Sequence, residues 1–204
     1  MEILHQNKDF VICIKPVGLD SQQEMCAALT EQLGGEVYPL HRLDKNVGGV
    51  MIYARSKQSA AQLSGIIARQ EMVKEYVAKV WGAPPKSATW EDHLFKDSTK
   101  NKVFVVKKPR KGVKDAKLAF VCLASGEESL VQIRLFTGRS HQIRVQFASR
   151  GFPLLGDGKY GAKDGYKAPM LFCARLTFPY QGKQLQFSAL PSWAEEALYE
   201  KIPG

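Results

Sequence analysis

The chain has 204 residues, 45% of them apolar, and is therefore long enough to bury one sizeable hydrophobic core. Lys and Arg outnumber Asp and Glu by 29 to 20, and the resulting net charge of +9 favours a polyanionic partner. No apolar run approaches the ~18 residues of a membrane span, and no secretory signal pattern opens the chain. We therefore expect a cytoplasmic protein without membrane association.

The first part of the chain predicts strands that alternate with helices. Val73–Trp81 has the alternating pattern of a strand, and Ser56 stands where it can cap a helix whose apolar stripe includes Leu63 and Ile66. The elements expected here are a strand at 10–14, a turn at 15–18, a helix around 25–33, a loop at 41–49, a strand at 50–54, a helix after residue 56 and a strand at 73–81.

The second part of the chain predicts mainly strands. We expect strands at 103–106, 119–123, 130–136, 171–178 and 184–187, a turn at 137–140, a helix at 141–150, and a last helix that begins at Ser192 with capping-box spacing. No repeat, low-complexity tract or linker marks a second domain, so residues 1–204 are expected to form a single domain. Many short strands with few helices indicate an α+β fold around a mainly antiparallel sheet.

The four cysteines give no sign of a metal or redox site. They are far apart in the sequence, and no C-x-x-C pair occurs. We interpret them as buried thiols in a reducing compartment, and we expect no bound metal. They are Cys13, Cys26, Cys122 and Cys173.

Most of the positive charge lies in one segment. Residues 96–117 contain nine Lys and Arg residues against Asp97 and Asp115, a local excess of +7 out of +9. A solvated hairpin kept soluble by lysines is one interpretation, and contact with phosphates is the other, which the concentration of charge favours.

A short loop, His41-Arg42-Leu43-Asp44, places a carboxylate beside two potential cations. Such a loop can be braced by a structural salt bridge. Alternatively, a cation within ~4–6 Å lowers the pKa of an Asp, which keeps the carboxylate ionised and ready to act as a nucleophile.

Two further segments place polar residues close together. Residues 137–144, Thr-Gly-Arg-Ser-His-Gln-Ile-Arg, hold two guanidinium groups that suit phosphate or a buried Asp, although a helix cap with exposed arginines would look the same. Residues 155–161, Leu-Gly-Asp-Gly-Lys-Tyr-Gly, favour a structural turn over a phosphate cradle, since no G-x-x-x-x-G-K-[ST] pattern is present. Tyr76, in its strand, is an ordinary aromatic for a core.

Together these segments resemble the RluA-type family of pseudouridine synthases, and they occur in that family's order. The resemblance covers nearly the whole chain. It rests on K-P-x-G at 15–18, H-R-L-D at 41–44, K-x-Y at 74–76, G-R-x-H-Q-I-R at 138–144, L-x-G-D-x-x-Y-G at 154–161 and the stretch at 171–191. H-R-L-D alone is a weak pattern, but G-R-x-H-Q-I-R at this distance makes it specific.

The resemblance implies an enzyme that isomerises specific uridines in structured RNA, ribosomal or transfer, to pseudouridine without a cofactor. It implies Asp44 as the catalytic aspartate, Arg139 as the arginine that pairs with it, and Tyr76 as the residue that stacks on the flipped base and can take the proton from C5. Leu171 would pack against the base. Whether Asp44 attacks the sugar or assists formation of a glycal is left open. The implied fold is a mixed, mainly antiparallel sheet in two halves, with a central catalytic cleft flanked by helices and loops.

Further residues are expected to contact the substrate. They are His41, Arg42, Leu43, His141, Gln142 and Arg144 in the motifs, and Lys107, Lys108, Arg110 and Lys111 in the basic segment. The K-P-x-G strand begins near residue 10, so no RNA-binding domain is expected in front of it, and RNA affinity would come from the catalytic domain.

The chain departs from the family pattern at several positions. Residues 44–49, D-K-N-V-G-G, replace the commoner D-R-x-T-S-G, and Gln146 stands where a His is common. Phe172-Cys173 stands where His-Ala is frequent, and Tyr180-Gln181 replaces a usual His-Pro. These changes affect expected substrate contacts more than the chemistry.

Two other functions are conceivable from the sequence. A non-catalytic RNA-binding protein derived from a synthase would have lost Asp44, Tyr76 or Arg139, and all three are present. A hydrolase built on Ser140 and His141 would need a G-x-S-x-G elbow, which is missing. RNA is thus the expected partner, and nothing in the sequence demands an oligomer, so we expect a monomer.

Overall fold

The computed structural model describes residues 1–194, which fall into two compact units. The first unit is formed by residues 1–74 and 172–191. The second is formed by residues 75–171 and 192–194. The expectation of a single domain over residues 1–204 stays a prediction.

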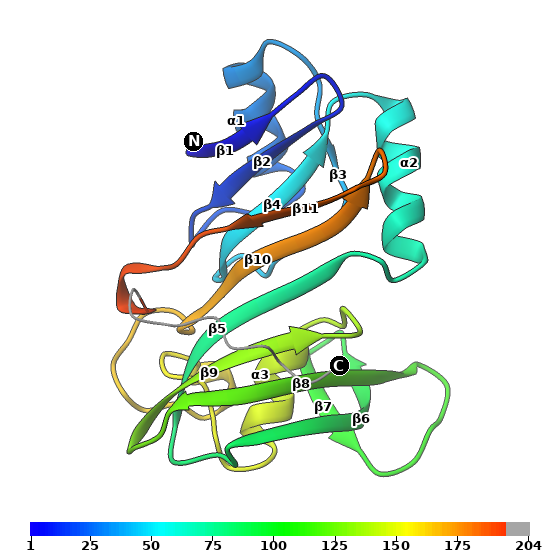
Figure 1. The fold of residues 1–204 in the computed structure, drawn as a ribbon. Helices are drawn as coiled ribbons and strands as arrows, with labels where there is room; N and C mark the ends of the chain where they lie inside the picture. The colour runs from blue at the N-terminus through cyan, green and yellow to red at the C-terminus, as the bar shows by residue number, and fades with distance from the viewer. Residues whose placement is uncertain (195–204) are drawn as a thin grey trace. The chain divides into compact units, whose positions relative to one another are not determined.

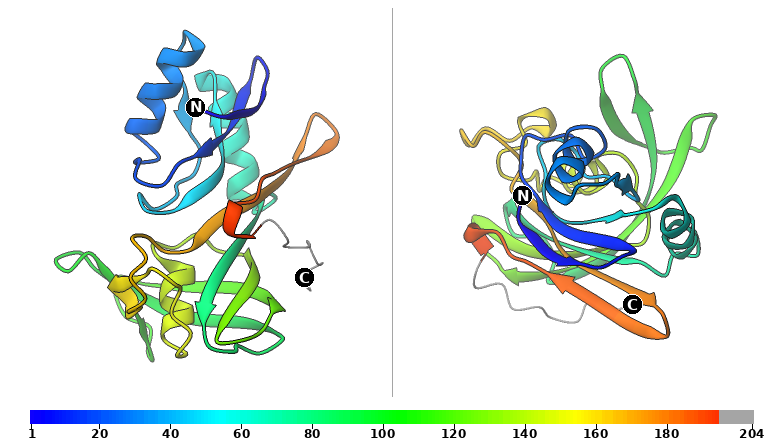
Figure 2. Two further views of the ribbon diagram at one scale, coloured as in Figure 1. Left: turned by 90° about the vertical axis from the view of Figure 1, so that its left-hand side faces the viewer. Right: turned by 90° about the horizontal axis from the view of Figure 1, so that it is seen from above.

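The first unit is a small sheet with two helices (Figure 1). Its strands run in the order β1-β2-β4-β10, with β3 paired to β4 and β11 paired to β10. Only the β4–β10 pair among these is parallel. The β10–β11 pair extends as a two-stranded ribbon (Figure 2). The elements are β1 (Ile3–Gln6), β2 (Phe10–Lys15), α1 (Glu24–Leu33), β3 (Tyr38–Pro39), β4 (Gly48–Ala54), α2 (Lys57–Ala68), β10 (Leu171–Tyr180) and β11 (Lys183–Ser188).

Local sequence explains two features of this unit. Ser56 caps α2 through a reciprocal capping box with Ser59, as its position predicted. Gly49 has φ +135°, and a Cβ on it would overlap the backbone of Cys173 on the paired strand β10. Only glycine therefore allows β4 to lie this close to β10 directly after the Asp44 loop.

The second unit is a sheet with strand order β5-β9-β8-β6-β7, against which α3 packs (Figure 1). The rings of Trp90, Phe120 and Phe147 meet in its core with centroids 4.6–5.1 Å apart. The elements are β5 (Val73–Trp81), β6 (Ser87–Asp97), β7 (Lys102–Val106), β8 (Val113–Ala124), β9 (Glu128–Leu135), α3 (Gln142–Ala148) and the 3₁₀ turns η1 (Gly158–Tyr160) and η2 (Ser192–Ala194).

The predicted α+β fold with a mixed, mainly antiparallel sheet is confirmed. The long strand β6 was not predicted, because Asp92 stands on its inward face where an apolar residue would be expected. Arg150 binds both oxygens of Asp92, at 2.9 and 3.0 Å, and so permits its burial. The helix predicted after Ser192 lies, beyond the η2 turn, outside the described residues. Residues 1–194 contain no helix long and apolar enough to cross a membrane.

Candidate active site

The loop that carries Asp44 is held by hydrogen bonds to its backbone from the segment after β2. Gly18 N–H donates to the Lys45 carbonyl at 2.8 Å, and the buried Ser21 hydroxyl donates to the Leu43 carbonyl at 3.1 Å. Val47 N–H closes the loop on the Asp44 carbonyl at 2.9 Å. Asp44 is half-buried, whereas Arg42 is exposed and Leu43 is only 5% exposed. The backbone around Asp44 is thus fixed by its partners.

Lys15 is the central support of this loop. Its side chain is fully buried, and Nζ donates to the carbonyls of Pro16 and Leu19, both at 2.8 Å, and of Lys45 at 3.1 Å. Burial lowers the pKa of Lys15 to about 8, and the negative charges of Asp20 and Asp44 oppose this shift. The K-P-x-G segment therefore places a buried positive charge where it acts on Asp44.

Lys15→Met should destabilise the protein, because three carbonyls lose their shared donor at a cost of about 1–3 kcal/mol in the free energy of unfolding. The folded pKa of Lys15 lies below its value of 10.5 in the unfolded chain, so wild-type stability should rise as pH increases from about 8 to 10.5. The Met variant should lack this rise. Urea unfolding of both proteins across this pH range measures the effect, and parallel curves would contradict it.

His41 is not one of the cations of the loop. Burial, with a smaller effect of the positive charge of Lys74, lowers the pKa of His41 to about 3, so its ring is neutral at physiological pH. Nε2 accepts a hydrogen bond from the Ile52 N–H at 3.3 Å. Nδ1 is buried and has no hydrogen-bond partner among the described residues. Of the two cations expected beside Asp44 in its motif, only Arg42 is charged. Lys15, from outside the motif, is a second positive charge near Asp44.

In the second unit, the G-R-x-H-Q-I-R and L-x-G-D-x-x-Y-G segments come together. The buried Arg144 donates to both oxygens of Asp157, at 2.6 and 2.8 Å, and Asp157 is only 1% exposed. Gly156 has φ +76°, and a Cβ on it would overlap the carbonyl of Ala168, so glycine is required next to this Asp. The 155–161 segment is a turn, as predicted, and its Asp157 is a buried Asp partner of the kind considered for the arginines of 137–144.

Tyr160 connects the same two segments a second time. Its hydroxyl lies 2.8 Å from Nδ1 of His141 and accepts a hydrogen bond from the Val103 N–H of the edge strand β7 at 2.9 Å. The Arg144 guanidinium carbon lies 5.1 Å from the centre of the Tyr160 ring. His141 and Arg144 are thereby fixed in position.

Gln142 and Arg139 have different surroundings. The amide of Gln142 is buried and braces the loop, because Oε1 accepts from Arg139 N–H and from Thr137 Oγ1 while Nε2 donates to the Lys117 carbonyl. Arg139 itself is exposed, and its Nε donates to the Asp115 carbonyl at 2.8 Å. Gln142 therefore has a structural role, and direct contact with a substrate stays a prediction for both residues.

The two expected base-contacting residues are both buried on strands. Tyr76 lies on β5 and is 6% exposed, and Leu171, the first residue of β10, is also 6% exposed. By contrast, the predicted phosphate-binding side chains are exposed in the loop between β7 and β8, which projects from the strands of the second unit (Figure 1). They are Lys107, Lys108, Arg110 and Lys111.

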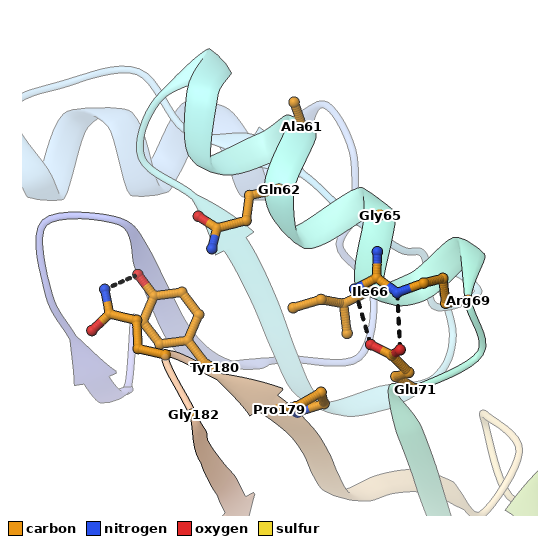
Figure 3. Close-up of a pocket in the computed structure, with 10 residues that line it drawn as sticks. Ala61, Gln62, Gly65, Ile66, Arg69, Glu71, Pro179, Tyr180 and Gly182 are labelled. Carbon is orange, nitrogen blue, oxygen red and sulfur yellow. Dashed lines mark hydrogen bonds and ion pairs between the residues drawn. The ribbon is translucent and has the colours of Figure 1, made fainter.

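Two departures from the family pattern contact residues other than the predicted site residues. Gln146 is fully buried and donates to Asp92 Oδ2 at 2.7 Å, so it supports the core. Tyr180 and Gln181 line a hollow of about 420 Å³ between α2 and the β10–β11 turn, which none of the predicted site residues lines (Figure 3). Burial, together with the hydrogen bond to Asp9, raises the pKa of Tyr180 to about 12.

Comparison with known proteins places these segments in a family. Residues 9–149 match the family model described as RNA pseudouridylate synthase. The chain belongs to this family of pseudouridine synthases. It is therefore an enzyme, an intramolecular isomerase, as predicted, and the expected membership is confirmed.

The similarity extends over nearly the whole chain. The chain is 27% identical to the tRNA pseudouridine synthase C of Vibrio vulnificus, over 99% of this chain and 95% of that protein. It is 26% identical to the ribosomal large subunit pseudouridine synthase D of Zymomonas mobilis, over 93% and 68%. The structure of human RNA pseudouridylate synthase domain containing 4 superposes with a TM-score of 0.80 at 26% identity, over 94% of this chain and 89% of that one.

Residues 1–194 of the synthase contain no group of three or more His, Cys, Asp and Glu side chains that could hold a metal ion. The sequence did not indicate that Lys15 is a buried support of the Asp44 loop, or that Asp157 is the carboxylate that pairs with Arg144. Both lie in motifs that were recognised, but the partners that reveal these roles, the Lys45 carbonyl and Arg144, lie 30 and 13 positions away.

Proposed function

We propose that the enzyme converts uridines of structured transfer or ribosomal RNA to pseudouridine, with Asp44 as its nucleophile. In this reaction the bond between uracil N1 and C1′ of the ribose breaks, the base turns, and C5 bonds to C1′. The proton leaves C5 and N1 regains one, so the reaction balances without another reactant. The transfer and ribosomal RNA substrates named for the two relatives support this substrate class.

The observation that carries the proposal for Asp44 is the fixed, charge-supported loop around it. The fully buried Lys15 Nζ donates to the Lys45 carbonyl at 3.1 Å, so a positive charge lies beside the half-buried Asp44 side chain in this loop. An ionised carboxylate is the form that can attack a sugar carbon or assist loss of the base.

The proposed roles of Tyr76 and Arg139 rest on the family resemblance. An aromatic ring replaces the stacking that a flipped base loses, worth ~1–3 kcal/mol. Arg139 is proposed as the cation that pairs with Asp44, and Arg144 is a second candidate because its guanidinium is buried and already oriented by Asp157. Activity of Arg139→Lys and Arg144→Lys distinguishes them, since the arginine required to orient the aspartate should tolerate lysine least.

The exposed cations of the β7–β8 loop are proposed to contact RNA phosphates. Each phosphate contact releases counterions, so charge reversal of Lys107, Lys108, Arg110 and Lys111 to Glu should weaken RNA binding and flatten its dependence on salt by roughly one unit of log–log slope per lost contact. Titrations at several salt concentrations measure the slope. Reversal of Lys57 and Lys183, which are remote in sequence, is the control, and an unchanged slope in the loop variant would refute the contact.

The function is tested by mapping pseudouridine in cellular RNA with and without the protein, and with its Asp44→Asn variant. Sites that depend on the protein should disappear in the variant. Identical maps for wild type and variant would refute the catalytic proposal and favour an RNA-binding protein without activity. We expect the enzyme to act as a cytoplasmic monomer without a cofactor.

A further inference from the structure

The β6–β7–β8 layer of the second unit has one face turned to α3 and one turned away from it. Leu94, Val103 and Ala116 pack with Val145 of α3, so the alternate residues of each strand point to the opposite, outer face. Phe95 of β6 lies directly across from Phe104 of β7, which places both rings on that outer face.

The two rings are accompanied by cations. The Arg110 guanidinium carbon lies 4.8 Å from the centre of the Phe95 ring, and Lys102 Nζ lies 5.9 Å from that of Phe104. Phe104 is 37% exposed, one of three large apolar side chains that are exposed among residues 1–194. We call Phe95, Phe104, Lys102 and Arg110 the aromatic platform. Two aromatic rings with cations beside them suit a partner that has both flat apolar surfaces and negative charge.

The same face continues into a hollow of about 550 Å³ lined by groups that can hydrogen-bond. Its three acidic residues are all paired: Asp115 lies 2.7 Å from Nδ1 of His93, Glu91 lies 2.8 Å from Lys117 Nζ, and the inward-facing Asp92 lies 2.9 Å from Arg150. Arg139 donates from Nε to the carbonyl of Asp115, one of the residues that line this hollow. The outer face therefore leads from the basic loop, over the platform, to an arginine of the motif that defines the family.

We propose that this face binds an unpaired stretch of RNA. One base stacks on Phe104 beside Phe95, and the phosphates of the RNA backbone lie near the β7–β8 loop. Stacking on an aromatic ring tolerates any base, and the surrounding cations match the phosphates. A double helix cannot use the platform, because its bases are already paired across the strands and stacked on their neighbours. The inference deepens the proposed function by naming where the RNA that flanks the target uridine lies.

The test is binding of a fluorescein-labelled oligouridylate, alone and annealed to its complement, by wild type and by Phe104→Ala and Phe104→Trp. Phe104→Ala should bind the single strand about 5- to 150-fold more weakly, with an unchanged salt slope, because stacking releases no counterions. Phe104→Trp should keep wild-type affinity. Binding of the duplex should be the same for all three proteins.

Equal single-strand affinity of Phe104→Ala and wild type would overturn the platform, and so would an equal loss with single strand and duplex. Phe104→Leu, which keeps an apolar side chain, guards against a folding defect and should bind as weakly as Phe104→Ala. Since this assay needs no turnover, its failure leaves the Asp44 proposal standing. Conversely, identical RNA maps for wild type and Asp44→Asn would refute catalysis and leave the platform intact.

Discussion

Asp44→Asn should fold like the wild type and lose pseudouridine formation by a factor on the order of 10⁴ or more. An amide has nearly the shape of a carboxylate, so the backbone contacts that fix the loop through Gly18 and Ser21 remain. It carries no negative charge, however, and cannot form or assist a bond at C1′. The rate is measured as pseudouridine formed under single-turnover conditions with enzyme in excess.

A matched control is Glu36→Gln, the same kind of change at an exposed carboxylate of the first unit. It should retain the wild-type rate. If Asp44→Asn kept more than about a tenth of the activity, Asp44 would not be the nucleophile, since removal of such a group normally has a far larger effect.

Arg144→Met should lower the free energy of unfolding by about 3–5 kcal/mol, because it leaves the carboxylate of Asp157 buried without its partner. The pair is among the most buried ionic contacts described, with Asp157 1% exposed. Urea unfolding measures the loss. A cost below about 1 kcal/mol would contradict the importance of the pair.

The double variant Arg144→Met/Asp157→Leu separates stability from function. Replacing both partners by apolar residues of similar size should recover most of the stability, because no buried charge is left. Activity should stay low if Arg144 orients Asp44 or the substrate. Recovery of activity together with stability would limit Arg144 to a packing role.

Local rules predicted the elements whose signal lies in their own residues or in residues next to them. The strand Val73–Trp81 was predicted with the bounds observed, and Ser56 caps α2 through Ser59, three residues away. By contrast, β6 was missed because its inward Asp92 is neutralised by Arg150, 58 residues away. Sequence periodicity cannot show that a charged residue has a distant partner.

Prediction of the candidate site also succeeded where the signal was local and failed where it depended on distant partners. The motif residues could be located by resemblance, but the contacts between the motifs could not. Lys15 supports the Asp44 loop from 30 positions away, and Asp157 fixes Arg144 from 13 positions away. The loop residue His41 was expected to be a possible cation, and its burial shows that it is neutral. Burial decides charge, and it depends on the complete fold.

The most direct test of catalysis by Asp44 is tritium release from RNA labelled at C5 of uridine, because C5 must lose its hydrogen when it bonds to the ribose. The RNA is taken from cells that lack the protein, so that its target sites are unmodified. Wild type should release tritium to water in step with the pseudouridine formed, and Asp44→Asn should release none above background. Equal release by both proteins would contradict the assignment of Asp44 as the nucleophile.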